Sequence, residues 1–145
     1  MGNRKGFTLI ELIAVVVIMA IIALLATPNI IGLLEKGKKE EFVADAKEFI
    51  SKASYQYRSE KFNKDNQNEG QTYDIGNIKG VDSEDTENGP WGKPYTGEVI
   101  IGNDGGKITY KITLSTQDRS DKTYKFDKVK KEDINIDNIV VEDNK

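Results

Sequence analysis

The sequence predicts an α+β protein: one long N-terminal helix with a small antiparallel β-sheet packed on its second half. Three observations lead to this prediction. An unbroken apolar run occupies residues 12–26, an amphipathic helical pattern follows over residues 35–58, and alternating strand patterns fill residues 96–145. Residues 59–95 are polar and interrupted by glycine and proline, so we expect a loop region there.

The apolar segment begins at Phe7, and only Thr8 and Glu11 interrupt it before Ala26. At about 1.5 Å per helical residue, its length matches the ~30 Å hydrocarbon thickness of a bilayer. A helix satisfies its own backbone hydrogen bonds in lipid, so we expect a membrane-spanning helix. Arg4 and Lys5 precede it and place the N-terminus in the cytoplasm, with the rest of the chain outside.

Glu11 is a carboxylate in an otherwise apolar segment. At the centre of a bilayer an ionised carboxylate costs about 2.5–3.5 kcal/mol. Either Glu11 lies near the cytoplasmic end, where water reaches it, or it is reserved for a positive partner. Cleavage between Gly6 and Phe7 would create such a partner, because the new α-amino group would lie four residues before Glu11 on the same helical face.

The stretch from Arg4 to Glu11, Arg-Lys-Gly-Phe-Thr-Leu-Ile-Glu, resembles the class III signal of type IV prepilins and pseudopilins. That signal is a short basic leader ending in glycine, then phenylalanine, with glutamate at the fifth mature position. Pro28 also stands where many members carry a proline. The resemblance implies that a prepilin peptidase removes residues 1–6 and methylates the Phe7 amine. It also implies that Glu11 pairs with this amine in a neighbouring subunit as the apolar helices pack into a filament.

An ordinary secretory signal peptide is the rival interpretation of the N-terminus. It requires small residues before a cut behind the apolar run, but a cut after Ala26 leaves Leu24 at the critical position. Composition limits the remaining functions. The full chain carries 21 basic and 24 acidic residues, so after loss of Arg4 and Lys5 the balance is 19 to 24, or −5, and we expect no nucleic-acid binding.

The chain contains neither histidine nor cysteine, so it has no disulfide. It also shows no phosphate-binding loop and no metal-ligand spacing, and we predict that it is not an enzyme and needs no cofactor. Many Gram-negative pilins close the C-terminal region with a disulfide. Its absence favours a Gram-positive-type pilin or a pseudopilin.

Apolar residues recur at helical spacing beyond the membrane segment, with charged residues on the opposite face. We therefore expect one helix from Phe7 to Arg58, kinked or locally melted near Pro28. The residues expected to pack against the sheet are Phe42, Phe49 and Tyr57.

The expected loop region contains an acidic run and an aromatic turn. The acidic run contains Asp82, Glu84, Asp85 and Glu87 and is typical of a solvated connection. Because carboxylates can bind calcium, Asp82 and Asp85 are also calcium candidates, but weak ones, since the run lacks the spacing of an EF-hand. The turn Gly89-Pro90-Trp91-Gly92-Lys93-Pro94-Tyr95 should lay Trp91 on the exposed edge of the amphipathic helix. It resembles the Pro-Trp-Gly-x-Pro-Tyr signature of major type II secretion pseudopilins, although the aspartate that often precedes it is Gly89 here.

Strict alternation of apolar and polar residues marks the strands of the last third. The expected hairpin joins residues 98–101 to residues 107–114 through a glycine-rich turn, a further strand covers residues 122–128, and the tail could add a short last one. Ile108, Tyr110, Ile112 and Leu114 should face the helix, in a sheet of three or four strands.

The expected organisation is a leader (residues 1–6), a transmembrane and assembly helix (7–34) and a globular head (35–145). The expected function is a structural subunit of a type IV pilus, with a pseudopilin of a type II secretion or DNA-uptake system as the alternative. A plain membrane-anchored binding module also stays open. The expected partners are identical or related pilin subunits, the prepilin peptidase, the membrane and the pilus assembly machinery. The chain would be a single-pass membrane protein first and an extracellular filament afterwards.

Overall fold

The computed structural model describes residues 6–62 and 70–144, apart from the side chains of residues 27–29 and of Phe62. Arg4 and Lys5 of the expected leader therefore lie outside the described residues, as does the side chain of Pro28. The chain divides into two compact units, residues 1–36 and 37–145, and each is described by itself.

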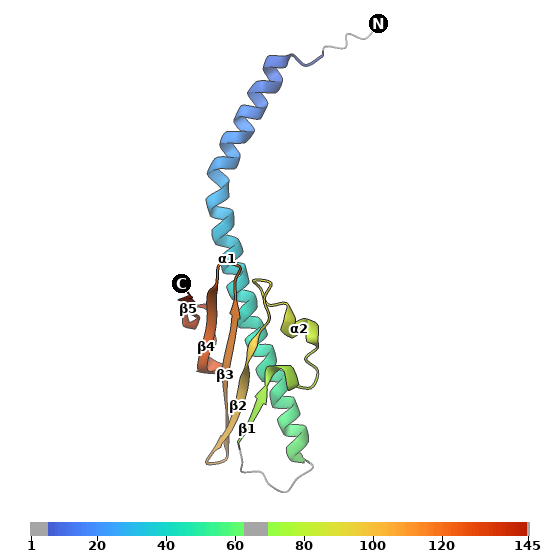
Figure 1. Cartoon of the computed structure of the whole chain (residues 1–145), viewed down its shortest axis with the longest axis vertical. Coiled ribbons are helices and arrows are strands. Elements are labelled where there is room, and N and C mark those ends of the chain that lie inside the picture. The colour runs from blue at the N-terminus through green and yellow to red at the C-terminus, as the bar shows by residue number, and fades with distance from the viewer. Residues whose placement is uncertain (1–5, 63–69, 145) are drawn as a thin grey trace. The chain divides into compact units, whose positions relative to one another are not determined.

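The first unit is helical from Leu9 onward, where helix α1 (Leu9–Phe62) begins (Figure 1). It contains the one described helix long and apolar enough to cross a membrane, Leu9–Ala26, with a mean hydropathy of 3.1 and none of it buried. Helix α1 begins at Leu9 rather than Phe7 and ends at Phe62 rather than Arg58. The helical backbone continues through Pro28, so the expectation of local melting there is wrong.

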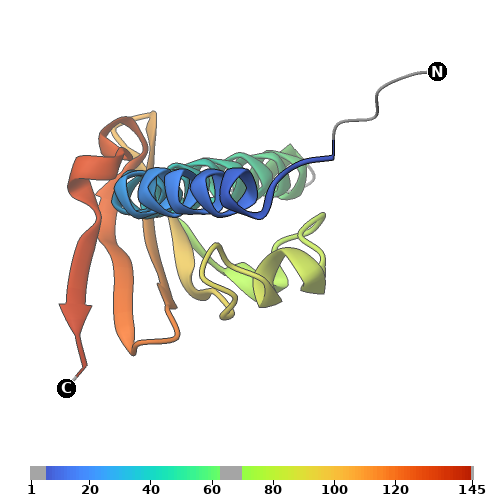
Figure 2. The ribbon, with the colours of Figure 1, turned by 90° about the horizontal axis from the view of Figure 1, so that it is seen from above.

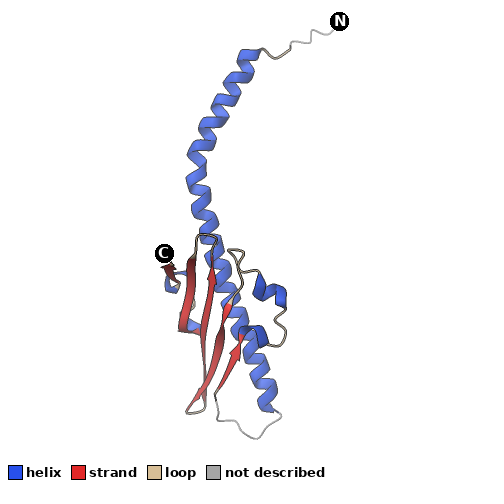
Figure 3. Ribbon diagram, in the orientation of Figure 1, coloured by secondary structure: helices blue, strands red, loops and turns tan. Residues whose placement is uncertain are grey.

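The second unit, the head, contains the rest of α1 and one antiparallel sheet in the order β1-β2-β3-β4-β5 (Figure 3). The strands are β1 (Gln71–Asp74), β2 (Thr96–Asp104), β3 (Lys107–Gln117), β4 (Lys122–Lys130) and β5 (Val140–Asp143). Gly105 and Gly106 join β2 to β3 with φ values of 59° and 91°. Positive φ at both positions is the requirement of the tight type I′ turn, which explains the two glycines.

The sheet packs its apolar face on the second half of α1 (Figure 2). The side chains that fill this contact are buried: Phe42, Ala46, Phe49, Ile50, Ala53 and Tyr57 from α1, and Val99, Ile101, Ile112, Leu114, Tyr124 and Phe126 from the strands. The alternation expected along β3 agrees with Ile112 and Leu114, which are completely buried. The predicted α+β architecture, a sheet packed on the later part of a long helix, is confirmed.

The region expected to be a loop, residues 59–95, is more structured than predicted. It holds the last turn of α1, strand β1, a 3-10 turn η1 (Ile75–Asn77) and the short helix α2 (Ser83–Glu87). Ile75 and Ile78 are buried in the core beside them. Elements of three to five residues show at most one or two periods of a helix or strand pattern, which is too few to distinguish them from a loop, so the sequence could not reveal them.

Two further 3-10 turns, η2 (Lys131–Asp133) and η3 (Ile136–Asn138), connect β4 to β5. The sheet has five strands where three or four were predicted: β5 is the short last strand expected in the tail, and the four-residue edge strand β1 was not predicted.

Candidate functional site: the N-terminal segment and the head

Gly6 and Phe7 precede α1 in a segment without regular secondary structure. Phe7 is 89% exposed, and no heavy atom lies within 4 Å of the position that a Cβ on Gly6 would occupy. The peptide bond that the resemblance marks for cleavage is therefore open to a protease, with no helical hydrogen bonds to break first.

Thr8 and Glu11 form reciprocal hydrogen bonds at the start of α1. The Thr8 backbone N–H and hydroxyl both donate to Oε2 of Glu11, at 2.8 and 2.9 Å. In return the Glu11 N–H donates to Oγ1 of Thr8 at 3.3 Å. This is a capping box, in which the threonine side chain satisfies a free helix N–H and the glutamate reaches back to the cap residue.

Because of the capping box, the Glu11 carboxylate already has a hydrogen-bond partner, Thr8, within its own chain. The positive end of the helix dipole also favours a carboxylate in the first turn. The Thr-x-x-Glu spacing of residues 8–11 could have revealed this role, but the apolar surroundings of Glu11 pointed to a cation as its partner.

The apolar helix exposes large side chains over its whole circumference. Ile10, Met19 and Leu24 are 75%, 65% and 76% exposed, and so are their neighbours on the other faces. A helix that is apolar all round is stable only in lipid or among other helices. This segment therefore suits anchoring in a membrane before any assembly.

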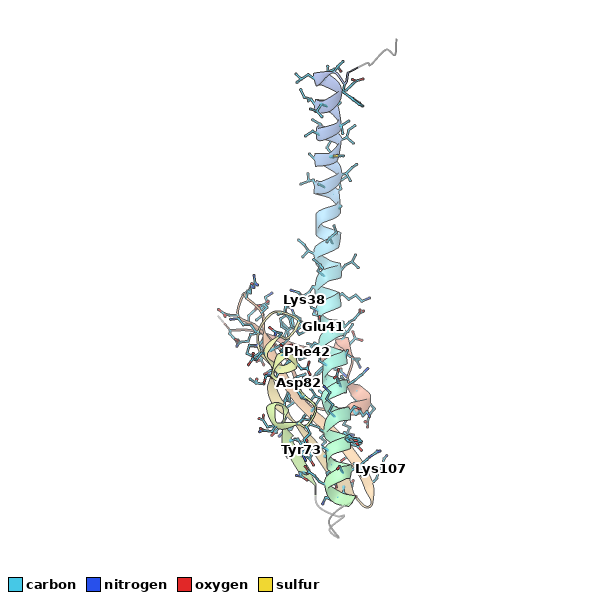
Figure 4. The ribbon with its side chains drawn as sticks, turned by 90° about the vertical axis from the view of Figure 1, so that its right-hand side faces the viewer. Lys38, Glu41, Phe42, Tyr73, Asp82 and Lys107 are labelled. Atoms are coloured by element: carbon cyan, nitrogen blue, oxygen red, sulfur yellow. The ribbon has the colours of Figure 1, made fainter. Side chains whose placement is uncertain are left out.

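In the head, aromatic rings join α1 to the sheet. Phe42 stacks on Phe126 of β4, with ring centroids 5.0 Å apart, and meets the edge of Trp91 at 5.9 Å. Trp91 in turn stacks on Tyr124 of β4 at 3.9 Å. Trp91 thus packs between α1 and β4, and Phe42 points from α1 into the same cluster (Figure 4).

Phe49 and Tyr57 also lie in the core, 2% and 3% exposed. Phe49 packs against the Tyr95 ring at 5.6 Å, and the Tyr95 hydroxyl donates a short hydrogen bond to Asp45 of α1. Burial raises the pKa of the Asp45 carboxyl, and burial together with this hydrogen bond raises the pKa of Tyr95. Tyr95 is therefore a protonated donor at neutral pH.

The two weak calcium candidates have other contacts. The Asp85 carboxylate accepts the Asp82 backbone N–H at 3.2 Å and lies 3.4 Å from Nζ of Lys52, which is 2.8 Å from Glu48. These contacts attach α2 to α1. In the part of the chain that the structure describes, no group of three or more acidic side chains could hold a metal ion.

Comparison with known proteins agrees with the N-terminal geometry. The family described as the prokaryotic N-terminal methylation motif matches residues 1–27. The chain therefore carries the N-terminal methylation motif of type IV pilins and pseudopilins. With the long helix and the sheet packed on it, this is a pilin-like chain.

The pilin-like chain is also distantly similar to proteins named type II secretion system core protein G. It is 40% identical over 45 residues to the one from Klebsiella pneumoniae and 42% identical over 43 residues to the one from Escherichia coli strain K12, matching 31% and 30% of this chain. The protein from Dickeya chrysanthemi is 43% identical over 43 residues.

These matches span only about a third of each relative, between 28% and 32% of its length. No solved structure matches the chain. The motif and the relatives place the pilin-like chain among structural proteins, in agreement with the prediction that it is not an enzyme.

Proposed function

We propose that this chain is a filament subunit that prepilin peptidase cuts between Gly6 and Phe7, and that it serves as a pseudopilin of a type II secretion-like system. The observation that carries the proposal is the methylation motif over residues 1–27, joined to an apolar helix whose surface is exposed all round. Such a surface requires lipid before assembly and other helices afterwards.

The pseudopilin is favoured over the pilus subunit for two reasons. The relatives from Klebsiella pneumoniae and Escherichia coli are core proteins of type II secretion systems. The turn Pro90-Trp91-Gly92-Lys93-Pro94-Tyr95 also resembles the signature of major pseudopilins, and its Trp91 and Tyr95 are both buried in the head. The type IV pilus subunit is the second candidate, because the N-terminal signal is common to both classes.

The chemistry of assembly follows from the residues around the cut. Cleavage frees an ammonium group at Phe7, next to the cap residue Thr8. In a lone subunit Glu11 accepts both Thr8 hydrogen bonds. Within a bundle of apolar helices water is excluded, and an unpaired charge there costs several kcal/mol. Pairing Glu11 with the Phe7 ammonium of a neighbouring subunit neutralises both charges and fixes the axial stagger between subunits.

Intact-mass analysis of the protein from its own cells tests the cleavage. The expected product lacks residues 1–6 and carries one additional methyl group. Gly6→Val should block processing, because a subsite next to the cut bond leaves little room for a side chain. Gly2→Val, the same change elsewhere in the leader, should leave processing unchanged. Assembled filaments that retain Met1 would refute the cleavage.

Electron microscopy and a secretion assay separate the two candidates. A strain lacking the chain should lose protein secretion, while parent cells show short surface filaments or none. Long surface filaments on the parent, with secretion intact in the deletion strain, would identify a pilus subunit instead.

A further inference from the structure

A basic groove of about 560 Å³ lies where β3 extends beyond the end of β4. The last residue of β4, Lys130, pairs with Lys111, so the earlier part of β3, residues 107–110, has no β4 residue beside it. Asp104 and Glu132 line the groove together with four lysines, Lys107, Lys111, Lys130 and Lys131. These four lysines define the basic groove. It is a positive surface on a chain whose net charge is −3.

The four lysines of the basic groove outnumber its two acidic residues, so the positive charge of the groove is only partly neutralised. Lys111 lies directly opposite Lys130 in the β3–β4 register, and like charges at facing positions destabilise a sheet. Among the described residues, the ion pairs of Lys52, Lys122 and Lys125 lie elsewhere, and none involves the four groove lysines. Lys131 is held over the Tyr110 ring, 5.5 Å from its centroid. An anionic partner would relieve this repulsion.

A surface of the opposite charge lies on the other side of the head. Asp82, Glu84 and Glu87 are exposed around α2, and we call them the acidic helix face. Among the α2 carboxylates in the described structure, only Asp85 has a lysine partner. Helix α2 lies near the β1 edge, beside η1, whereas the lysines of the basic groove belong to β3, β4 and η2. Asp82 and Lys107 lie on opposite sides of α1 in Figure 4.

The positions of these two surfaces decide what kind of contact they can make. A contact between different patches of two copies leaves one free patch of each kind at the ends, so it can continue from subunit to subunit along a filament unless its rotation closes a ring. We infer that the acidic helix face of one copy docks into the basic groove of the next copy along the filament. This inference rests on the proposed function, because it places the contact between heads of assembled subunits.

Lysines at such a position can also bind a polyanion or protect a strand edge, and each of these roles has a different consequence. A free polyanion such as a nucleic acid would meet Asp104 and Glu132 in the groove and a negatively charged protein around it, which disfavours phosphate binding. Lysines protect an exposed strand edge from pairing with other chains. Glutamates protect an edge in the same way, so charge reversal separates that role from docking.

Charge reversal in the full-length chain, expressed in its own cells, tests the inference. The variants Lys111→Glu/Lys130→Glu and Glu84→Lys/Glu87→Lys should each reduce filament yield by about tenfold or more, because like charges then meet at the contact. Combining all four changes should restore most of the yield. The control Lys47→Glu/Lys93→Glu makes the same change in net charge as the lysine variant, at exposed positions outside both surfaces, and should assemble like the parent.

A zero-length carbodiimide cross-linker gives a direct measurement. In filaments assembled from a mixture of 15N-labelled and unlabelled subunits, mass spectrometry should find Lys111 or Lys130 joined to Glu84 or Glu87 with mixed labelling. The inference would be overturned if every such cross-link joined two peptides with the same label, or if no cross-link between the two surfaces were found.

The yields distinguish this inference from the proposed function. Normal filaments from both reversal variants would overturn the inference and leave the proposed function intact. A combined variant that stays defective while purified Lys111→Glu/Lys130→Glu protein loses binding to duplex DNA would assign the groove to a polyanion and also overturn it. A parent that is processed but shows no assembled subunits, neither as filaments nor as cross-linked multimers in its membranes, would overturn the proposed function and the inference together.

Discussion

Replacing Phe42 with alanine should remove the centre of the head. Phe42 is completely buried, and its ring lies 5.0 Å from that of Phe126 and 5.9 Å from those of Trp91 and Tyr95. Removing a buried phenylalanine costs about 3–5 kcal/mol, and each lost aromatic pair is worth about 0.5–1.5 kcal/mol beyond buried area. With three ring partners, we expect a loss near 5 kcal/mol, at the upper end of the Phe→Ala range.

Urea unfolding of the detergent-solubilised full chain, followed by Trp91 fluorescence, measures this loss. Trp91 is the chain's single tryptophan and stacks on Tyr124, so its emission reports on the same cluster. Small domains have unfolding free energies of about 5–15 kcal/mol, so the Phe42→Ala head should retain about 0–10 kcal/mol and unfold at a much lower urea concentration than the parent. Phe42→Leu keeps an apolar side chain and should cost about 1.5 kcal/mol.

Tyr55→Ala is the matched control, since Tyr55 is an aromatic residue of the same helix that is 79% exposed. It should change stability by no more than about 0.5 kcal/mol. If Phe42→Ala and Tyr55→Ala unfold at the same urea concentration, with equal dependence on urea, the placement of the core on this face of α1 is wrong.

Three further predictions concern assembly, backbone and pH. Glu11→Ala should leave membrane insertion and leader cleavage intact but abolish regular filaments, and Glu11→Asp should assemble in part. The measurement is the filament yield of each variant beside its fraction of processed protein. Normal filaments from Glu11→Ala would refute the pairing. Gly97→Ala should cost about 2–4 kcal/mol in a thermal melt, because Gly97 has φ +147° and a Cβ would collide with the Thr113 carbonyl oxygen. Burial raises the pKa of Asp45, so the folded head holds this proton more tightly than the unfolded chain. Stability should therefore fall as pH rises from about 4 through the raised pKa, and Asp45→Asn, which can still accept the Tyr95 hydrogen bond, should flatten that fall in unfolding experiments across this range.

The sequence was sufficient for the large elements because each repeats its pattern over several periods. Residues 12–26 are apolar without a break, and α1 places Phe42, Phe49 and Tyr57 at helical spacing. Strand β3 alternates polar and apolar residues over residues 107–114, which predicts one buried face. The N-terminal signal is a local motif, so its recognition needed no tertiary structure.

The contacts of the head could not be predicted because they join residues far apart in the chain. The hydrogen bond from Tyr95 to Asp45 spans 50 residues, and the contact of Lys52 with Asp85 spans 33. No local pattern selects one such pair among many acidic and basic residues. Asp85 lies in the five-residue helix α2, which is too short to be recognised by its pattern, and Tyr95 lies outside any helix or strand.

The basic groove depends on a single irregularity of the sheet. The β3–β4 register shifts between Ile112 and Leu114, where β4 has one extra residue and Lys128 has φ +50°. Without this bulge Ile112 would face Lys128 and Lys111 would face Val129. The bulge instead pairs Ile112 with Val129 on the buried face and brings Lys130 opposite Lys111. A one-residue shift thus decides the position of a charge, and alternation alone could not reveal it.

The capping box limits what the Glu11 pairing can contribute to filament stability. In the lone subunit the carboxylate already accepts two hydrogen bonds from Thr8, so assembly replaces existing contacts with an ion pair. The gain is the difference between the two arrangements, and it is smaller than the full cost of an unpaired buried charge. The driving force must then come mainly from packing the exposed apolar surface of residues 9–26 among other helices. Under the proposed function, Glu11 accordingly selects the stagger at which a subunit is accepted, because any other stagger leaves the Phe7 ammonium among apolar side chains without a carboxylate.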